Sequence, residues 1–480
     1  MGEEAPPSPA AAATTLYVDG CPGCAMERRL ESNKGIPYKE LFFVAITSIA
    51  TALPISSLFP FLYFMIEDLH VAKKEQDIGL YAGFLGASYF VGRFLASLFW
   101  GVVADRIGRK PIIIFSVFSV VIFNTLFGLS VKYWMAIATR LLLGALNGML
   151  APIKAYSIEV CRPEHQALGL SIVSTGWGIG LVIGPSIGGY FARPAQQYPN
   201  LFSDNSIFGR FPYLLPCLCI SLFNLAVLVS CIWLPESLHK HKNVDREVEM
   251  SGDLRTPQTE DVHPKKSLYK NRPLMSSILA YCVFTLHDTA YSEIFSLWAI
   301  SDRKYGGLSF SSKEVGQVLA IAGAGLLAYQ LFIYRSVHKF LGSVNSCRVA
   351  SVLSIPILAA YPFMTHLSGF KLGIALYLAT IVKGVLAITI LTGTSLLQNY
   401  AVPQSQRGAA NGISATAMSF FKAIGPAGAG ALFSWAQKRQ DASFLPGDQI
   451  IFFILNVVEF IGLILTFKPF LALPENYDLK

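Results

Sequence analysis

The sequence predicts an all-α polytopic membrane protein with twelve transmembrane helices, arranged as two pseudo-symmetric six-helix bundles. Its 480 residues are 53% hydrophobic and only 14% charged, whereas about 25% charged residues are usual in soluble domains. The hydrophobic residues gather in long runs, and landmarks of the first half of the chain recur in the second half. Related halves of this kind are typical of secondary transporters.

The apolar runs each have the length of one membrane-crossing helix, because about 20 residues span roughly 30 Å of hydrocarbon. The first six runs occupy residues 41–66, 78–103, 111–131, 134–158, 167–191 and 211–234. The last six occupy residues 273–300, 313–334, 346–366, 370–400, 407–436 and 448–471. We therefore expect bundles at 41–234 and 273–471, a linker at 235–272, and tails at 1–40 and 472–480.

The formal net charge of +8 comes mainly from segments between the apolar runs. Lys and Arg favour the cytosolic loops of membrane proteins, and an even number of spans returns the chain to the side where it began. Both tails and the basic linker are therefore expected in the cytosol. Nucleic-acid binding is not expected, because it requires the basic residues to gather on one solvated surface.

A basic segment at 101–110 separates the second and third runs and reads Gly-Val-Val-Ala-Asp-Arg-Ile-Gly-Arg-Lys. Its cations favour a short cytosolic loop, and its glycines suggest a backbone that turns at close quarters. The pattern Gly-x-x-x-Asp-Arg-x-Gly-Arg-Lys resembles the loop between the second and third helices of the major facilitator superfamily. We expect this loop to stabilise one state of the gate, through Gly101, Asp105, Arg106, Gly108, Arg109 and Lys110.

Asp105, the acidic residue of this loop, is expected to have two kinds of partner. The carboxylate of Asp105 can accept hydrogen bonds from the amides of a neighbouring helix end and can pair with basic residues across the contact between the two halves. A simpler interpretation is that the segment only directs membrane topology, as charge clusters do in any polytopic protein.

The fourth run carries Arg140, Gly144, Gly148 and Pro152 at four-residue intervals, which places them along one stripe of a helix. The two glycines are interpreted mainly as a packing seam, because they allow another helix to approach closely. An arginine inside a span is unfavourable and usually faces a cavity or a counter-charge. The pattern resembles the fourth-helix motif of facilitators that exchange protons for solutes, which implies a coupling role for Arg140.

The fifth run contains Gly176, Gly180, Gly184 and Pro185. Their spacing favours close helix contact and a bend at the proline. The run resembles the glycine-proline signature of facilitator antiporters, which implies efflux or sequestration. Gly425-Pro426 in the eleventh run repeats Gly184-Pro185 about half a chain later.

The seventh run holds ionisable residues at membrane depth, where they point to function. Asp288 and Tyr291 share one helix face, whereas Glu293 is expected to point away and to lie nearer the outer surface. Lys383 in the tenth run is expected at the depth of Arg140 in the first half. The candidate residues for substrate or proton coupling are Arg140, Asn147, His287, Asp288, Tyr291 and Lys383.

The predicted coupling mechanism joins Arg140 to Asp288 in the cavity between the halves. Moving the guanidinium toward or away from the carboxylate would release or bind a proton. Lys154, Lys422 and Glu459 are secondary candidates, since long side chains near helix ends reach toward the interface.

The first run contains Pro54 and Pro60 among Ser and Thr residues. A kinked or broken helix is therefore expected there, as in helices that line a central cavity. This run has no acid at mid-span, which departs from many proton-driven facilitators and weakens any transfer of their proton site to this helix.

Two segments outside the runs complete the resemblance: Cys21-Pro22-Gly23-Cys24, and Leu234-Pro235-Glu236-Ser237-Leu238-His239 followed by His241. With the motifs above, they resemble the zinc-induced facilitator-like family of plants over essentially the whole chain. The resemblance implies a proton-coupled exporter of the plasma or vacuolar membrane, linked to zinc, to chelators such as nicotianamine or mugineic acids, or to potassium. Two thiolates and two imidazoles also suit tetrahedral zinc, so Cys21, Cys24, His239 and His241 form a candidate metal site, with a disordered tail and a solvated loop as the alternative.

The sequence fits three other functions less well than antiport. An importer of peptides, nitrate or sugars conflicts with the antiporter-like fifth run. A metal sensor that does not transport would not require Arg140 and Asp288, two charged residues inside predicted spans. An enzyme is disfavoured because the sequence has no nucleophile elbow, phosphate loop or His-rich cluster. We expect a monomer in the lipid bilayer whose partners are protons and a small solute or ion, with no cofactor.

Overall fold

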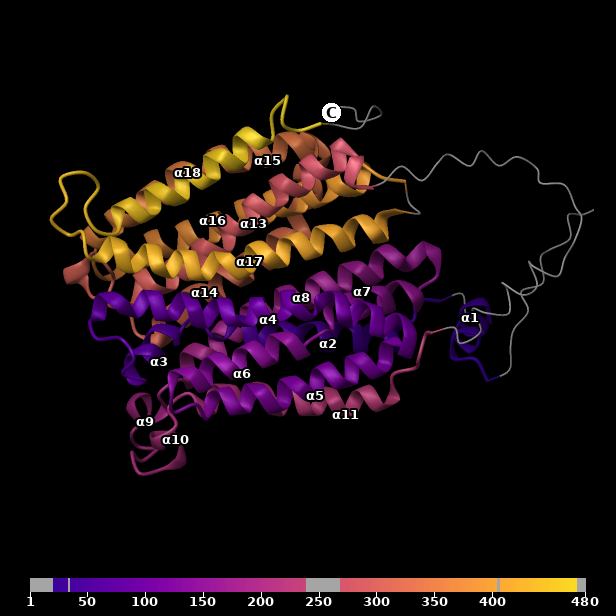
Figure 1. Ribbon diagram of the computed structural model, residues 1–480, viewed down its shortest axis with the longest axis horizontal. Helices are drawn as coiled ribbons and strands as arrows, with labels where there is room; N and C mark the ends of the chain where they lie inside the picture. The colour runs from indigo at the N-terminus through magenta and orange to yellow at the C-terminus, as the bar shows by residue number, and fades with distance from the viewer. Residues whose placement is uncertain (1–19, 33–34, 239–267, 404–405, 473–480) are drawn as a thin grey trace, which may run out of the picture.

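The computed structural model describes residues 20–32, 35–238, 268–403 and 406–472. Within these ranges the chain is helical and contains no strand. Figure 1 shows two bundles of long, nearly parallel helices, with the N-terminal half in indigo to magenta and the C-terminal half in pink to yellow. The short helix α1 (Pro22–Ser32) lies beyond one end of the N-terminal half.

The helices coincide with the apolar runs of the sequence. The N-terminal half contains α2 (Tyr38–Ser56), α3 (Leu62–Asp68), α4 (Ile78–Ile107), α5 (Arg109–Gly128), α6 (Tyr133–Leu146), α7 (Leu150–Glu159), α8 (Gln166–Phe191) and α11 (Leu214–Ser230), with α9 (Pro194–Gln197) and α10 (Ile207–Arg210) in a loop. The C-terminal half contains α13 (Arg272–Ile300), α14 (Ser312–Ala328), α15 (Tyr334–Ala360), α16 (Gly369–Tyr400), α17 (Arg407–Gln437) and α18 (Gln449–Leu465).

Two of the spans are each built from two helices. The first span breaks between α2 and α3, as its prolines predict. The fourth span breaks at residues 147–149, between α6 and α7. The predicted stripe from Arg140 to Pro152 therefore does not follow one continuous helix, although Gly144 and Gly148 do pack closely against α4, where a Cβ would meet Tyr89 and Trp100.

The eighth and ninth spans are continuous in the structure. The chain turns at Gly342, which has φ 71° inside α15, a conformation that favours glycine. Eight segments of the described chain are long and apolar enough to cross a membrane, and one of them, Ser312–His366, contains both of these spans. Together with α13, α17 and α18, these segments give the twelve predicted spans, and the predicted fold class is confirmed.

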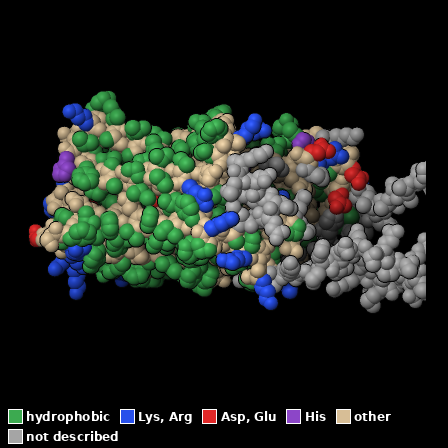
Figure 2. Space-filling view, turned by 90° about the horizontal axis from the view of Figure 1, so that it is seen from above, with side chains coloured by type: hydrophobic (Ala, Val, Ile, Leu, Met, Phe, Trp, Pro, Cys, Tyr) green, Lys and Arg blue, Asp and Glu red, His purple; other side chains and the backbone are tan. Residues whose placement is uncertain are grey.

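The outer surface has the character of a lipid-facing belt. Figure 2 shows hydrophobic side chains over most of one long face of the molecule. Exposed large hydrophobic residues occur in both halves, including Leu95, Phe99, Phe332, Leu378 and Phe460. A soluble monomer rarely exposes so extensive an apolar surface, whereas lipid solvates it.

The two halves meet along α4 against α17 and α8 against α14. Glycines allow this close approach: a Cβ on Gly83 would lie 2.4 Å from the Pro426 carbonyl oxygen, and one on Gly189 would lie 2.6 Å from the Ser312 carbonyl oxygen. We call this contact the seam. Larger residues at these positions would force the halves apart.

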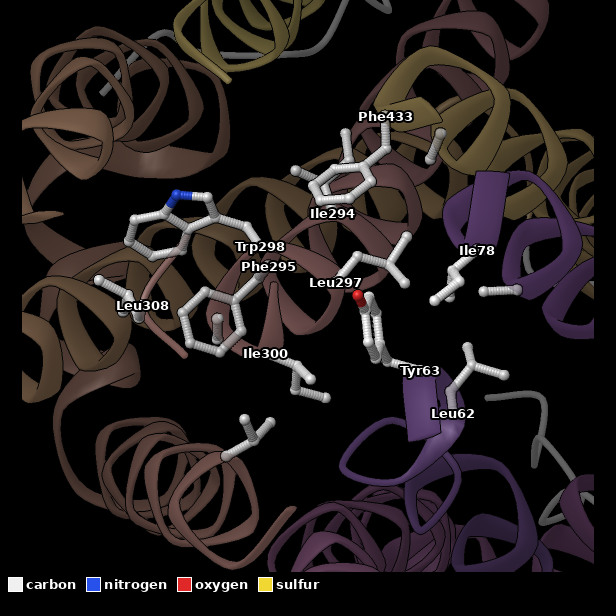
Figure 3. Packing of buried hydrophobic residues seen from close by; sticks show 14 of the residues in the cluster. Leu62, Tyr63, Ile78, Ile294, Phe295, Leu297, Trp298, Ile300, Leu308 and Phe433 are labelled. Carbon is white, nitrogen blue, oxygen red and sulfur yellow. The ribbon is translucent and has the colours of Figure 1, made fainter. Parts of the chain in front are cut away.

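The seam is closed at the end of the bundle that contains Trp298, which we call the Trp298 end; the opposite end, at the turn around Gly108, is the Gly108 end. Figure 3 shows Leu62, Tyr63 and Ile78 of the N-terminal half beside Ile294, Leu297 and Ile300 of the C-terminal half, within one hydrophobic core. This core joins the halves and excludes water between them.

Polar contacts reinforce the closure at the Trp298 end. Lys304 Nζ lies 2.7 Å from Glu75 Oε2, and Lys438 Nζ lies 2.6 Å from Asp77 Oδ1. The hydrogen bond to Glu75 raises the pKa of the Lys304 ammonium. Further hydrogen bonds that join the two halves also lie toward this end.

Candidate transport site

Arg140 is buried in the N-terminal half, where its side chain is 2% exposed. Its Nη1 donates to the Pro54 carbonyl oxygen at 2.9 Å, which lies in the last turn of α2, where helix carbonyls lack intrahelical partners. Its guanidinium carbon lies 5.3 Å from the Tyr89 ring centroid and 5.2 Å from that of Phe127. The broken first span thus supplies the acceptor that lets a cation sit at this depth.

Glu293 is an ionisable group of the C-terminal half that lies within electrostatic range of Arg140. Glu293 lies toward the Trp298 end of α13. Its side chain is 1% exposed and lies at the seam, next to Gly86. The predicted approach of Asp288 to Arg140 is not found in this state. Helix periodicity separates Asp288 from Glu293 correctly, but it does not show which of their two faces meets the other half.

Three of the candidate residues face other helices of their own half. His287 Nδ1 lies 2.9 Å from Glu459 Oε2 of α18, and both side chains are fully buried. Lys383 Nζ lies 5.1 Å from the centroid of the Tyr291 ring, whose hydroxyl is hydrogen-bonded to that of Tyr361 at 2.7 Å. These contacts fix α13 against its neighbours within the C-terminal half.

Asn147 terminates α6 beside the break in the fourth span. Its Nδ2 lies 3.4 Å from the Tyr89 hydroxyl, while its buried Oδ1 has no hydrogen-bond partner in the described structure. Asn147 therefore shares Tyr89 with Arg140. The structure thus brings these two predicted residues together through a third residue that the sequence did not single out.

A cluster of cations spans the seam closer to the Gly108 end. Lys422 of α17 lies within electrostatic range of Arg93 of α4, Lys154 of α7 and Asp288 of α13, and Lys154 lies within range of Arg93. Lys154 is exposed, and the other three are half-buried. We call Arg93, Lys154 and Lys422 the cationic cluster.

In the structure, α4 and α5 extend into the predicted gating loop, so that Gly108 alone lies between the two helices. Gly108 has φ 123° and separates α4 from α5, and a Cβ there would lie 2.4 Å from Glu236 Oε2. This confirms the tight turn at Gly108. Gly101 instead lies within α4, and a Cβ there would meet no described atom within 4 Å, so the close contact predicted for it is absent in this state.

Glu236 caps α5, a role that was predicted for Asp105. Its Oε1 accepts from the Arg109 amide at 3.0 Å and its Oε2 from the Lys110 amide at 3.1 Å. The side chain of Asp105 lies outside the described part of the structure. The Arg109 guanidinium pairs with Glu159 at 3.1 Å, so the turn is bound to segments far away in sequence.

We expect Glu236→Ala to lower the melting temperature of the detergent-solubilised protein. The change removes the acceptor of two amides at a helix N-terminus, and loss of such a cap costs about 1–2 kcal/mol. Glu236→Gln keeps one carbonyl acceptor and should lie between the alanine variant and the wild type. An alanine variant that melts like the wild type would show that water replaces the carboxylate.

The amino-terminal cysteines lie beside the segment that follows the sixth span. The Gly23 amide donates to the Leu238 carbonyl oxygen at 3.2 Å, and Cys21 and Cys24 are buried. His239 and His241 lie outside the described residues, and the described chain holds no group of three His, Cys, Asp or Glu residues that could bind a metal. The structure therefore places the thiols next to the chain that leads into His239 and leaves the metal site as a prediction.

The glycines of the fifth span, in α8, pack against α2. A Cβ on Gly176 would lie 2.8 Å from Ser48 Cβ, and one on Gly180 would lie 2.5 Å from Ala52 Cβ. A Cβ on Gly184, just before Pro185, would overlap the Ser56 hydroxyl. These close contacts hold α8 in a fixed position against α2, the helix that supplies the Pro54 carbonyl oxygen to Arg140.

Comparisons with known proteins agree with this architecture. The family model described as Major Facilitator Superfamily matches residues 44–426. The protein named ZINC INDUCED FACILITATOR 1 of Arabidopsis thaliana is 55% identical over 468 residues, covering 95% of this chain and 96% of that protein. A protein of the same plant, named as a probable peptide/nitrate transporter, is 54% identical over 467 residues, with 95% and 96% covered.

A crystal structure of a D-xylose–proton symporter shares the fold, with a TM-score of 0.67 over 90% of this chain and 97% of that one, at 13% identity. Fold and site together define a secondary transporter that is integral to the membrane and moves a small molecule. The chain belongs to the major facilitator superfamily and, within it, to the zinc-induced facilitator family of plants. The resemblance drawn from the sequence motifs is confirmed.

Proposed function

We propose that this protein is a proton-coupled antiporter that exports or sequesters a carboxylate-bearing metal chelator, of the nicotianamine or mugineic acid type, from the cytosol. The observation that carries the proposal is the cationic cluster at the seam. There α4 packs against α17, with the Phe94 and Phe420 ring centroids 5.6 Å apart, and Arg93 and Lys422, each within two residues of one of these rings, lie within electrostatic range of each other. A ligand held there contacts both halves, as the solute of an alternating-access transporter must.

The charge of the cluster discriminates among the substrates that the family suggests. Cations at one site repel free zinc or potassium ions, since like charges at close range raise the free energy. They attract carboxylates through charge-assisted hydrogen bonds. A chelated metal therefore suits this site better than the bare ion, and the name of the Arabidopsis relative links the family to zinc.

The Gly108 end is proposed to face the cytosol, in the plasma or vacuolar membrane. The basic residues at that end support this orientation, and it would put both tails and the linker in the cytosol. The state described here, closed at the Trp298 end, would then receive substrate from the cytosol. The antiporter-like glycines of α8 support exchange with protons over import.

Purified protein in proteoliposomes with an imposed pH gradient tests the proposal. Radiolabelled nicotianamine, a mugineic acid, zinc and potassium are compared as substrates. Chelator flux opposite to the proton gradient, absent from empty vesicles, is the expected result. Flux of the chelator in the same direction as protons, or flux of free metal ions alone, would overturn it.

The contact between the amino-terminal helix and Leu238 supports a separate zinc site on the cytosolic side, made of Cys21, Cys24, His239 and His241. We expect the full-length wild type to bind one more zinc ion than a Cys21→Ser, Cys24→Ser double variant at equal purity, since two thiolates and two imidazoles suit zinc. Cys219→Ser serves as the matched control. Equal zinc content in the three proteins would show that the site does not exist.

A further inference from the structure

We propose that Glu293 is the carboxyl group that carries the exchanged proton, and that its protonation is the condition for closing the seam at the Trp298 end. The inference rests on the proposed proton antiport and assigns the proton to a residue. It also differs from the sequence prediction, which gave this task to Asp288.

The environment of the Glu293 carboxyl group favours its neutral form. Glu293 is 1% exposed, and neither Oε1 nor Oε2 has a hydrogen-bond partner in the described structure. An ionised carboxylate without donors in a dry interior is strongly destabilised, whereas a neutral carboxylic acid loses much less solvation. Glu293 is therefore protonated in the closed state described here.

Arg140 is the cation within electrostatic range of Glu293. Arg140 of α6 reaches Glu293 electrostatically, but its Nη1 is occupied by Pro54 and its faces lie near two aromatic rings. The other ionisable groups on helices that pack against α13 have different neighbours: Tyr63 of α3, Tyr89 and Arg93 of α4, Lys313 and Glu314 of α14, Lys383 of α16, Lys422 of α17 and Glu459 of α18. Arg140 is thus the nearby cation that can stabilise the ionised form.

The third step is the position of Glu293 across the seam. A Cβ on Gly86 of α4 would lie 3.0 Å from Glu293 Oε2 and 3.2 Å from Pro426 Cβ. A glycine in the N-terminal half therefore covers a carboxyl group of the C-terminal half. Ile294 and Leu297, one and four residues further along α13, belong to the core that closes the Trp298 end (Figure 3).

Protonation of Glu293 is thereby coupled to closure of the seam at the Trp298 end. When the halves separate at the Trp298 end, α4 moves away from α13 and water reaches Glu293, whose carboxylate then takes a proton from the solvent on that side. The neutral acid can be buried again, whereas closing over the ionised form would leave an unpaired charge. After closure Arg140 turns from Pro54 toward the carboxylic acid and stabilises its ionised form. The O–H bond then breaks, its electron pair stays on the carboxylate oxygen, and a water molecule on the Gly108 side accepts the proton.

The test uses the full-length protein in proteoliposomes with radiolabelled nicotianamine. Glu293→Gln mimics the protonated acid and should abolish flux driven by a pH gradient while keeping nicotianamine counterflow. Glu67→Gln, an exposed carboxyl at the same end, should keep both. A Glu293→Gln protein that still responds to the gradient would overturn the assignment, whereas a wild type without pH-driven flux would overturn the antiport itself.

Infrared spectroscopy gives a readout that does not depend on transport. The spectrum of Glu293→Gln is subtracted from that of the wild type, because Asp448 is a second buried carboxyl group without a hydrogen-bond partner and contributes equally to both. The difference near neutral pH should show the carbonyl stretch of a buried protonated carboxylic acid. Gly86→Ala, which crowds the carboxyl group, should shift it. A difference spectrum without that band would show that Glu293 is not protonated and would overturn the proposal.

Discussion

Arg140→Ala is expected to abolish both pH-driven flux and counterflow, unlike the change at Glu293. The guanidinium holds the Pro54 carbonyl oxygen at 2.9 Å and lies near Tyr89 and Phe127. Its loss leaves a buried carbonyl without a donor, which costs about 1–3 kcal/mol, and also removes the counter-charge of Glu293. The broken first span would then lose its fixed position against α6, so substrate exchange should fail as well.

Arg140→Lys tests whether Arg140 acts through its positive charge or through the shape of its guanidinium group. Lysine keeps the positive charge but lacks the planar fork that can bond a carbonyl while it stacks on rings. We expect partial counterflow and weak pH-driven flux from this variant. Both variants are first checked by size-exclusion chromatography and melting temperature, so that a loss of transport is compared only among folded proteins. Normal coupling in Arg140→Ala would remove Arg140 from the mechanism.

Much of the fold could be predicted from composition and spacing alone, because a bilayer forces spans to be long, apolar and helical. The two prolines of the first run predict its break, and the turn at Gly108 follows from the need for a positive φ. The break at Asn147 was not predicted. It depends on Gly148 fitting against the Trp100 ring, a contact between two helices that local sequence does not report.

The site was predicted less completely, for a physical reason. Helix periodicity shows which residues share a face but not which neighbour that face meets, so Asp288 was favoured over Glu293. Arg93 was missed, although an arginine amid apolar residues is the same signal that identified Arg140. Glu236 caps a helix that begins 127 residues earlier, a pairing that only the folded chain brings together.

Lys422→Gln is expected to raise the KM for nicotianamine, because it removes one of the cations that would hold the carboxylates of the chelator. Loss of a hydrogen bond to a charged group costs about 1.5–3 kcal/mol, which corresponds to roughly a tenfold to hundredfold rise in KM. Lys422→Arg should stay near the wild type, since charge and reach are retained.

A change at Asp288, the acidic neighbour of Lys422, should shift the KM for nicotianamine in the opposite direction. Asp288 lies within electrostatic range of Lys422 and competes with an anionic substrate for it, so Asp288→Asn should lower the KM where Lys422→Gln raises it. Lys371→Gln, an exposed lysine at the start of α16, controls for the loss of one positive charge from the protein. The carboxylic acid band of Glu293 should persist in all of these variants, because the cationic cluster binds substrate and does not hold the proton. A KM for nicotianamine that is unchanged in both Lys422→Gln and Asp288→Asn would mean that the chelator binds elsewhere.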